Sequence, residues 1–300
     1  MEHDAGLRVV DLVTYPVKSC AGVHLTDAPV TERGLYLDRD FMLIDDDCDF
    51  VSQRKVSELA LVTVAIGARA LTLSAPGMVD VEVPLHIEPD DRRTVTATVH
   101  GREVLGQVVS DRLNDWFTAF LPRYKESRSF RLLQVREDAP RYVKDRYRRG
   151  EATNKVGFAD GNSMLLATEP SLRRLNSAME VAVPMNRFRP NIVVDGPGLE
   201  AYDEDHWTDL QIGAMRAFVV KASDRCVIPD TDQDTAVVGK AVRRALTARR
   251  GVNAYDETNK GVFFAQNLNH VYRPQTVVRV GDPVRVLART AQPNVLITAR

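Results

Sequence analysis

Short apolar and β-branched runs, separated by turn residues, recur along most of the chain and restrict it to a mostly-β fold. Runs of this length and composition are typical of strands. Turn chemistry around 45–47 indicates a hairpin loop, and 278–286 reads as two strand arms about a Gly-Asp-Pro turn. The predicted strands cover residues 7–13, 41–44, 61–66, 71–74, 95–99, 130–135, 164–167, 192–194 and 217–220.

Helical periodicity occurs at three places. Ser110 caps the first predicted helix, which Pro122 ends, and Thr168 caps the second. Apolar residues across 238–246 predict a third helix, which ends at Gly251. A mostly-β (α+β) chain with a few packing helices favours a barrel with a smaller appended domain.

Composition excludes several classes of function. A net charge of −1 argues against nucleic acid as a partner, because phosphate binding needs a basic excess. No apolar run has the roughly 18 residues of a membrane span, and no signal-type segment follows the acidic N-terminus, so we expect a cytoplasmic protein. Three cysteines, Cys20, Cys48 and Cys226, are too few and too far apart for a disulfide framework or an iron–sulfur cluster.

Although the net charge of the whole chain is close to zero, one stretch is strongly basic. Residues 123–149 hold ten Lys or Arg against four Asp or Glu, a local excess of six positive charges. Two interpretations remain open: a solvated connection between domains, or a docking surface for an acidic electron-transfer partner.

Cys226 is the side chain best suited to chemistry. It follows Arg225, and a neighbouring guanidinium favours the thiolate, the form that ligates metals and attacks electrophiles. Pro229, Asp232 and Thr235 follow at fixed spacing. The segment resembles the cysteine loop of the MOSC family, molybdenum-cofactor proteins that include the mitochondrial amidoxime-reducing component. The resemblance implies that Cys226 binds molybdenum. The family commonly has Gly where this chain has Ala236.

Other segments extend the resemblance from about Val9 to Val286. Residues 15–23 and 34–42 are similar to the N-terminal part of MOSC proteins, and 158–163, 186–194 and 281–284 follow in the family's order. Residues 263–267 resemble the segment on the substrate side of the cofactor. Arg189 and Asn191 point to the same side if their segment is extended.

The resemblance implies which residues contact the cofactor. The pterin of the cofactor ends in a phosphate, and a phosphate needs ammonium, guanidinium and hydroxyl donors. The predicted contacts, besides the metal ligand Cys226, are Lys18, Ser19, Arg39, Asp160, Ser163, Arg189, Asn191, Ser223 and Arg225. Cys20 is predicted to be a packed thiol.

The same resemblance implies the fold and the activity. We expect an N-terminal MOSC domain over 1–122, a basic connecting stretch over 123–150, a MOSC β-barrel over 151–290 and a tail over 291–300. The implied reaction is reduction of small N-hydroxylated compounds at the molybdenum cofactor. Electrons would come from a separate ferredoxin-type or cytochrome/flavoprotein-type donor. The resemblance also suggests binding of the pyridoxal-phosphate type. The alternative is a carrier of molybdenum cofactor, or of sulfane sulfur on Cys226.

Overall fold

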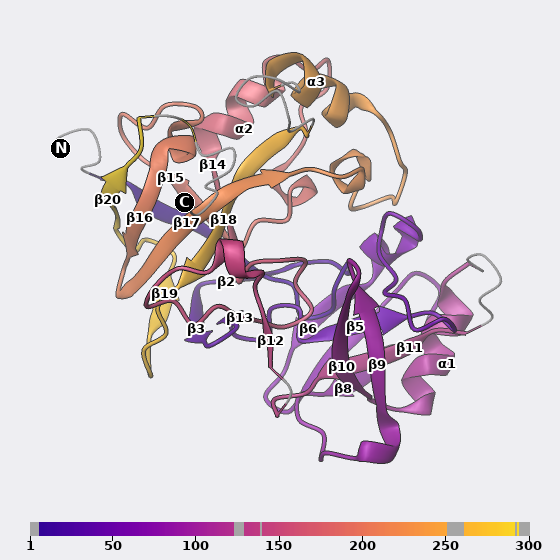
Figure 1. Cartoon of the computed structure of the whole chain (residues 1–300). Coiled ribbons are helices and arrows are strands. Elements are labelled where there is room, and N and C mark those ends of the chain that lie inside the picture. The colour runs from indigo at the N-terminus through magenta and orange to yellow at the C-terminus, as the bar shows by residue number, and fades with distance from the viewer. Residues whose placement is uncertain (1–5, 123–128, 139, 251–260, 292, 294–300) are drawn as a thin grey trace.

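The computed structural model describes residues 6–122, 129–138, 140–250, 261–291 and 293, and it arranges them in two adjoining parts (Figure 1). The first part is built on one large sheet within the described residues, and antiparallel pairs predominate in it. Its strands, in spatial order, are β2 (Val23–Leu25), β1 (Arg8–Thr14), β15 (Ile192–Asp195), β14 (Met164–Thr168), β18 (Phe263–His270), β17 (Met215–Asp224), β16 (Trp207–Ile212) and β20 (Val284–Arg289).

Backbone hydrogen bonds between the two ends of this sheet close it into a barrel. The amide of Val9 donates to the carbonyl of Asp282 at 3.0 Å, and Gly281 donates back to Val9 at 2.7 Å. Val284 donates to Leu7 at 2.8 Å. The barrel interior is filled by apolar side chains such as Trp207, so it is a packed core.

The second part, purple in Figure 1, consists of two smaller sheets and a helix around a separate apolar core. Its four-stranded sheet has the order β5 (Phe41–Ile44), β11 (Arg131–Val135), β10 (Arg102–Val108), β9 (Thr94–Val99). Its three-stranded sheet has the order β6 (Thr63–Ile66), β7 (Ala70–Ser74), β8 (Val81–Pro84).

Two further small sheets and several 3-10 helices complete the described elements. One small sheet contains β19 (Val277–Arg279), β3 (Asp27–Thr31) and β4 (Gly34–Leu35), and another contains β12 (Arg141–Tyr142) and β13 (Lys155–Val156). The short 3-10 helices are η1 (Ser57–Leu61), η2 (Asp91–Arg93), η3 (Asp145–Tyr147), η4 (Met185–Arg187), η5 (Asp203–His206) and η6 (Ile228–Asp230).

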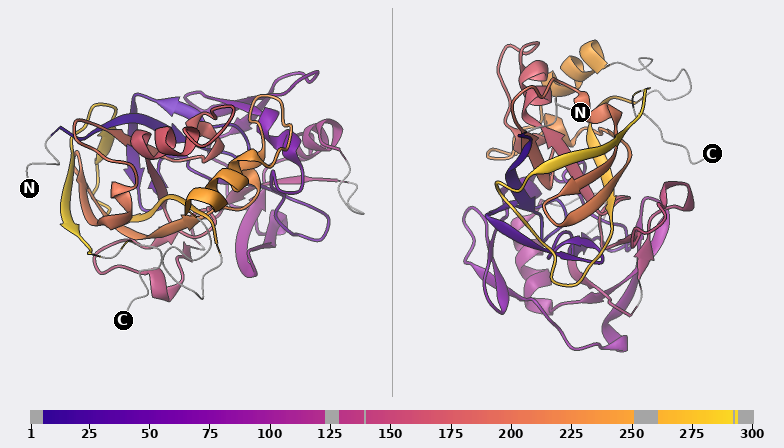
Figure 2. Two further views of the ribbon diagram at one scale, coloured as in Figure 1. Left: turned by 90° about the horizontal axis from the view of Figure 1, so that it is seen from above. Right: turned by 90° about the vertical axis from the view of Figure 1, so that its left-hand side faces the viewer.

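Three α-helices appear near the predicted places in the described chain. Ser110 caps α1 (Asp111–Phe120) and Thr168 caps α2 (Glu169–Asn176), each by accepting a backbone N–H. The third, α3 (Ala241–Arg250), starts later than predicted, and Gly251 lies outside the described residues. Figure 2 shows α2 and α3 together at the end of the barrel away from the second part. No helix in the described ranges is long and apolar enough to cross a membrane.

The structure differs from the predicted hairpin at 278–286. Its two arms do not pair with each other, because β19 pairs with β3 and β20 pairs with β16. The sheets combine strands from separate stretches of the chain: β1 and β2 belong to the barrel, and β11, from the basic stretch, is a central strand of the second part. The division of the chain into domains stays a prediction.

The basic stretch is only partly described, since 123–128 and 139 lie outside the described residues. Within the rest, Arg136 pairs with Asp91 and Asp138. Arg141 is buried and donates to backbone carbonyls. These two arginines therefore have local structural roles, and docking of an acidic partner stays a prediction.

Candidate functional site

Polar and basic side chains from both parts of the fold surround one cavity of about 150 Å³, here called the basic cavity. It is lined by Lys18, Ser19, Arg39, Ala159, Asp160, Gly161, Asn162, Met164, Leu165, Phe188, Arg189, Asn191, Ser223, Asp224, Arg225, Cys226, Ile228 and Asn267. The lining includes nine of the ten predicted site residues; Ser163 is the exception.

The turn after β1 places Lys18 and Ser19. The amide of Lys18 donates to the carbonyl of Phe41 at 2.8 Å, which ties the turn to the start of β5. Ser19 adopts a positive φ of 72°, and its carbonyl accepts a 2.7 Å hydrogen bond from Gln53. Both side chains are thereby presented from a turn anchored to the second part of the fold.

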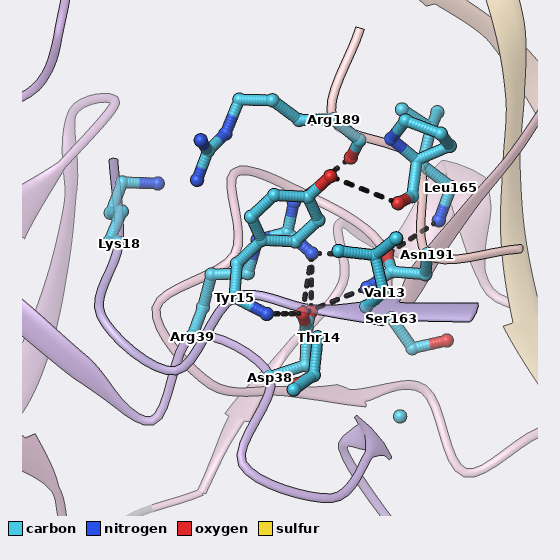
Figure 3. Close-up of polar contacts among 12 residues, drawn as sticks. Val13, Thr14, Tyr15, Lys18, Asp38, Arg39, Ser163, Leu165, Arg189 and Asn191 are labelled. Carbon is cyan, nitrogen blue, oxygen red and sulfur yellow. Dashed lines mark hydrogen bonds and ion pairs between the residues drawn. The ribbon is translucent and has the colours of Figure 1, made fainter. Parts of the chain in front are cut away.

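A buried hydrogen-bond network fixes Arg39 (Figure 3). The Arg39 guanidinium donates to Asp38 at 2.7 Å and to the side-chain oxygen of Asn191 at 3.0 Å. The amide nitrogen of Asn191 donates to Asp38 at 2.8 Å and to the carbonyl of Val13 at 3.1 Å. Its oxygen also accepts from the amide of Leu165 at 3.0 Å. Asn191 therefore ties β1, β14 and the Arg39 loop together.

Replacing Asn191 by Leu should lower the free energy of unfolding by roughly 2 to 4 kcal/mol, because several buried polar groups would lose their partner. Chemical denaturation measures this loss. The matched control is Asn176→Leu, which removes two hydrogen bonds to Val183 at a half-buried site and should cost less. Equal losses in the two variants would contradict the central position given to Asn191.

Arg189 is a buried cation without a carboxylate partner at ion-pair distance in the described chain. Its residue is 8% exposed, and its guanidinium lies 4.2 Å from the centroid of the Tyr15 ring (Figure 3). One terminal nitrogen donates weakly to Gln233 at 3.4 Å, and the other, Nη2, has no hydrogen-bond partner. Burial lowers the pKa of Arg189 to about 10. An anion in the cavity would satisfy this group.

Arg189 reaches the cavity by a different backbone route than the sequence suggested. The two side chains are predicted to share one side only if their segment is extended. Arg189 instead adopts a left-handed conformation with φ 55°, two residues after η4 ends, while Asn191 precedes β15. Both still line the basic cavity.

The end of β17 delivers the cysteine loop. Register shifts between β17 and β18 precede Asp224, where β17 ends. The guanidinium of Arg225 donates to Ser223 at 3.0 Å and to the carbonyl of Phe188 at 2.8 Å, while its Nε has no partner. Burial lowers the pKa of Arg225. The next residue, Cys226, is partly exposed and lines the cavity.

The other two thiols lie in different surroundings. Cys20 is fully buried, and burial raises the pKa of its thiol to about 12. Cys48 lies in the hairpin loop after β5 and accepts a hydrogen bond from Arg131 at 3.2 Å. Neither lines the basic cavity. Among the three, Cys226 alone combines access to the cavity with nearby cations.

The residues after Cys226 hold the loop in shape. One carboxylate oxygen of Asp232 accepts from the Thr235 hydroxyl at 2.9 Å and from the Thr235 amide at 2.9 Å. The other oxygen accepts from Arg187 at 2.6 Å. The Asp-x-x-Thr spacing seen in the sequence is therefore a loop-closing motif. Ala236 follows it with φ 58°, in the left-handed region.

Replacing Ala236 by Gly should raise the free energy of unfolding by about 0.5 to 1 kcal/mol, because glycine adopts positive φ without the clash of a Cβ. Thermal or chemical unfolding measures the gain. Ala241→Gly, at the exposed start of α3, is the control and should lower stability. A loss in both variants would contradict the assignment of strain to Ala236.

Lys18 forms an ion pair at the rim of the cavity. Its ammonium donates to the carbonyl of Phe158 at 2.9 Å and contacts the carboxylate of Asp160. Burial lowers the pKa of Lys18, and Asp160 opposes this shift. Nε2 of His100 lies 3.1 Å from the same carboxylate. Lys18 and His100 together hold the pKa of Asp160 well below its ordinary value.

Sequence reasoning missed His100 because nothing local marks it as a site residue. It sits with φ 50° in the turn between β9 and β10, in the second part of the fold. Asn162 and Asn267 also line the cavity. Both lie in segments of the family resemblance, 158–163 and 263–267, but neither was among the predicted contacts. A lone His in a strand-rich sequence carries no such signal.

Ser163 does not line the cavity, contrary to its predicted contact with the cofactor. It is buried, and its hydroxyl donates to the carbonyl of Leu268 at 3.0 Å and lies 3.1 Å from Nδ1 of His270. The preceding residue, Asn162, lines the cavity, whereas the Ser163 side chain is directed at β18. Ser163 links β14 to β18.

Four cations face the basic cavity, and carboxylates pair with only two of them. Arg39 pairs with Asp38 and Lys18 with Asp160, whereas Arg189 and Arg225 form no ion pair in the part of the chain that the structure describes. Asp224 is exposed at the lining. The arrangement favours binding of an anion beside an accessible thiol.

A larger cavity of about 680 Å³ lies between the two parts of the fold and shares Arg189 with the basic cavity. Its walls come from Ala60, Leu61 and Thr63 on one side and from Pro184 and Met185 on the other. A volume of this size is typical of small-molecule sites, commonly about 300 to 1,000 Å³.

Comparisons with known proteins agree with the sequence pattern. The MOSC N-terminal beta barrel domain matches residues 6–124, and the MOSC domain matches residues 153–285. Human "Mitochondrial amidoxime-reducing component 1" is 30% identical over 293 residues, which cover 94% of this chain and 83% of the relative. Bovine "Mitochondrial amidoxime reducing component 2" is 30% identical over 284 residues, or 92% and 82% of the two chains.

Proposed function

The chain belongs to the family of MOSC-domain proteins that includes the mitochondrial amidoxime-reducing components, and from this membership we propose that it is a molybdenum-cofactor-dependent reductase of N-hydroxylated compounds. The names of the relatives support an oxidoreductase that acts on small molecules. The single observation that carries the proposal is the basic cavity, which gathers eight other separately predicted residues around the Cys226 thiol.

The residues present suit the cofactor. Two buried arginine nitrogens, Nη2 of Arg189 and Nε of Arg225, lack hydrogen-bond partners and would be satisfied by phosphate or pterin acceptors. Lys18, Ser19 and Arg39, which line the same cavity, would complete the donors toward the phosphate. Cys226 would provide the protein sulfur to molybdenum. Asn191 and Ser223 stay in the proposed set of cofactor contacts, and Asp160 stays at the site as the ion-pair partner of Lys18. Ser163, whose hydroxyl contacts β18, leaves the set.

When bound, the cofactor supplies a two-electron oxygen-atom transfer. An amidoxime, a hydroxamic acid or an N-hydroxylated base would lose its N–O oxygen as water, with two electrons and two protons consumed. The chain's own part is to hold the anionic cofactor by fixed cations and to expose the Cys226 side of the cavity to substrate. A separate redox protein, of ferredoxin or cytochrome/flavoprotein type, would supply the electrons. Cytoplasmic location stays a prediction, and no observation supports pyridoxal-phosphate-type binding.

The direct test is reduction of benzamidoxime to benzamidine by cofactor-loaded protein with reduced methyl viologen as an artificial donor. Turnover that depends on protein and donor is the expected result. Loaded protein that reduces no benzamidoxime but passes its cofactor to a cofactor-free acceptor enzyme would instead favour the carrier function.

A further inference from the structure

We propose that the Asp160 carboxylate occupies the place of the cofactor phosphate beside Lys18 until the phosphate binds. The phosphate then pairs with Lys18, and His100 keeps the displaced carboxylate by a hydrogen bond. This inference rests on the proposed function, because it concerns the same basic cavity. It assigns His100, from the second part of the fold, a positioning role at the site.

The side chains of Lys18 and Asp160, which form the ion pair, differ in how far they are buried and fixed. The Lys18 side chain is 7% exposed, and its ammonium is also fixed by the carbonyl of Phe158 at 2.9 Å. The Asp160 side chain is 61% exposed. A new anion would therefore displace the solvent-facing carboxylate and leave the buried ammonium in place.

Only the side chain of Asp160 needs to move. Arg141 donates to the carbonyls of Gly157 at 3.2 Å, Ala159 at 2.5 Å and Asp160 at 3.2 Å. These bonds hold the backbone of the loop. Rotation of the carboxylate about its own side-chain bonds then suffices to exchange partners.

Electrostatics decides which anion keeps Lys18. A phosphate in the cavity would lie beside the Asp160 carboxylate, and the two negative charges would repel each other. Phosphate carries more charge and more acceptor oxygens than a carboxylate, and Arg39, Arg189 and Arg225 also face the cavity. Phosphate therefore takes the ammonium.

His100 is placed to receive the displaced carboxylate. Its Nε2 is already 3.1 Å from Asp160. Its ring packs against Phe50 with centroids 5.0 Å apart, and its side chain is 35% exposed. The ring therefore offers Asp160 a second hydrogen-bond partner, at present on the same carboxylate oxygen that Lys18 contacts.

The variant Asp160→Asn tests this role, because the proposal predicts that it lowers stability but strengthens phosphate binding. In full-length protein from a host that makes no cofactor, the variant should lower the unfolding midpoint, since buried Lys18 loses its counter-charge. The same variant should bind inorganic phosphate about five- to tenfold more tightly, as measured by calorimetry, since a competing anion is gone. Asp138→Asn removes a surface carboxylate that pairs with Arg136 and should leave phosphate binding unchanged.

His100→Gln provides a second, surface variant. It should weaken phosphate binding about two- to fivefold, because Asp160 returns to Lys18 more readily. The double variant should match Asp160→Asn alone, since His100 acts only through Asp160. Weaker or unchanged phosphate binding by Asp160→Asn would overturn the proposal. So would absence of phosphate binding in every protein. Benzamidoxime reduction by loaded wild-type protein tests the proposed function separately from either result.

Discussion

Cys226→Ser is expected to lower reductase turnover at least about 100-fold while leaving thermal unfolding within about 0.5 kcal/mol of wild type. Serine keeps the size of the side chain but is not a thiolate, so it cannot provide the sulfur proposed for molybdenum. Stability should hold because the Cys226 side chain is only partly buried, at the edge of the basic cavity. Steady-state benzamidoxime reduction and calorimetric unfolding measure the two effects.

The other cysteines are matched controls for this result. Cys48→Ser should leave both activity and stability near wild type, because Cys48 lies in a surface hairpin away from the cavity. Cys20→Ser should lower stability by roughly 1 to 2 kcal/mol, because it places a hydroxyl in an apolar core. Full activity in Cys226→Ser would remove Cys226 from the site.

Arg189→Met is expected to lower cofactor affinity roughly 30- to 100-fold, because hydrogen bonds from a charged donor contribute about 2 to 3 kcal/mol. Met keeps much of the contact with Tyr15 and removes the charge. Protein without cofactor should be as stable as wild type or more so, since a buried cation without a carboxylate partner disappears. Molybdenum and pterin content per chain measure the first effect, and unfolding of cofactor-free protein measures the second.

A surface arginine provides the control for this variant. Arg173 is 60% exposed in its side chain and pairs with Asp195 at 3.1 Å, outside the basic cavity. Arg173→Met should leave cofactor content unchanged. Unchanged content in Arg189→Met would show that Arg189 does not bind the cofactor.

Local patterns predicted most of the elements because their causes are local. Ser110 and Thr168 cap α1 and α2 as expected, since a cap depends on the next three residues. The apolar run 41–44 is β5. Pairing across the chain was beyond reach: the partners of β19 and β20 are β3 and β16, distant in sequence.

At the site, too, local features could be predicted from the sequence and features that depend on tertiary contacts could not. Resemblance selected residues that the fold brings into one cavity, and the Asp232–Thr235 spacing was visible in the sequence. Three features were not visible, because each depends on tertiary contacts. Arg189 reaches the cavity through a left-handed residue, the Ser163 side chain is directed at β18, and His100 arrives from another sheet.

Elemental analysis of molybdenum per chain, after expression in a cofactor-producing host supplied with molybdate, tests the central claim most directly. The account predicts a ratio near one for wild type and near zero for Cys226→Ser and Arg189→Met, all in folded protein. A wild-type ratio near zero in folded protein would contradict it and would favour sulfur transfer through Cys226.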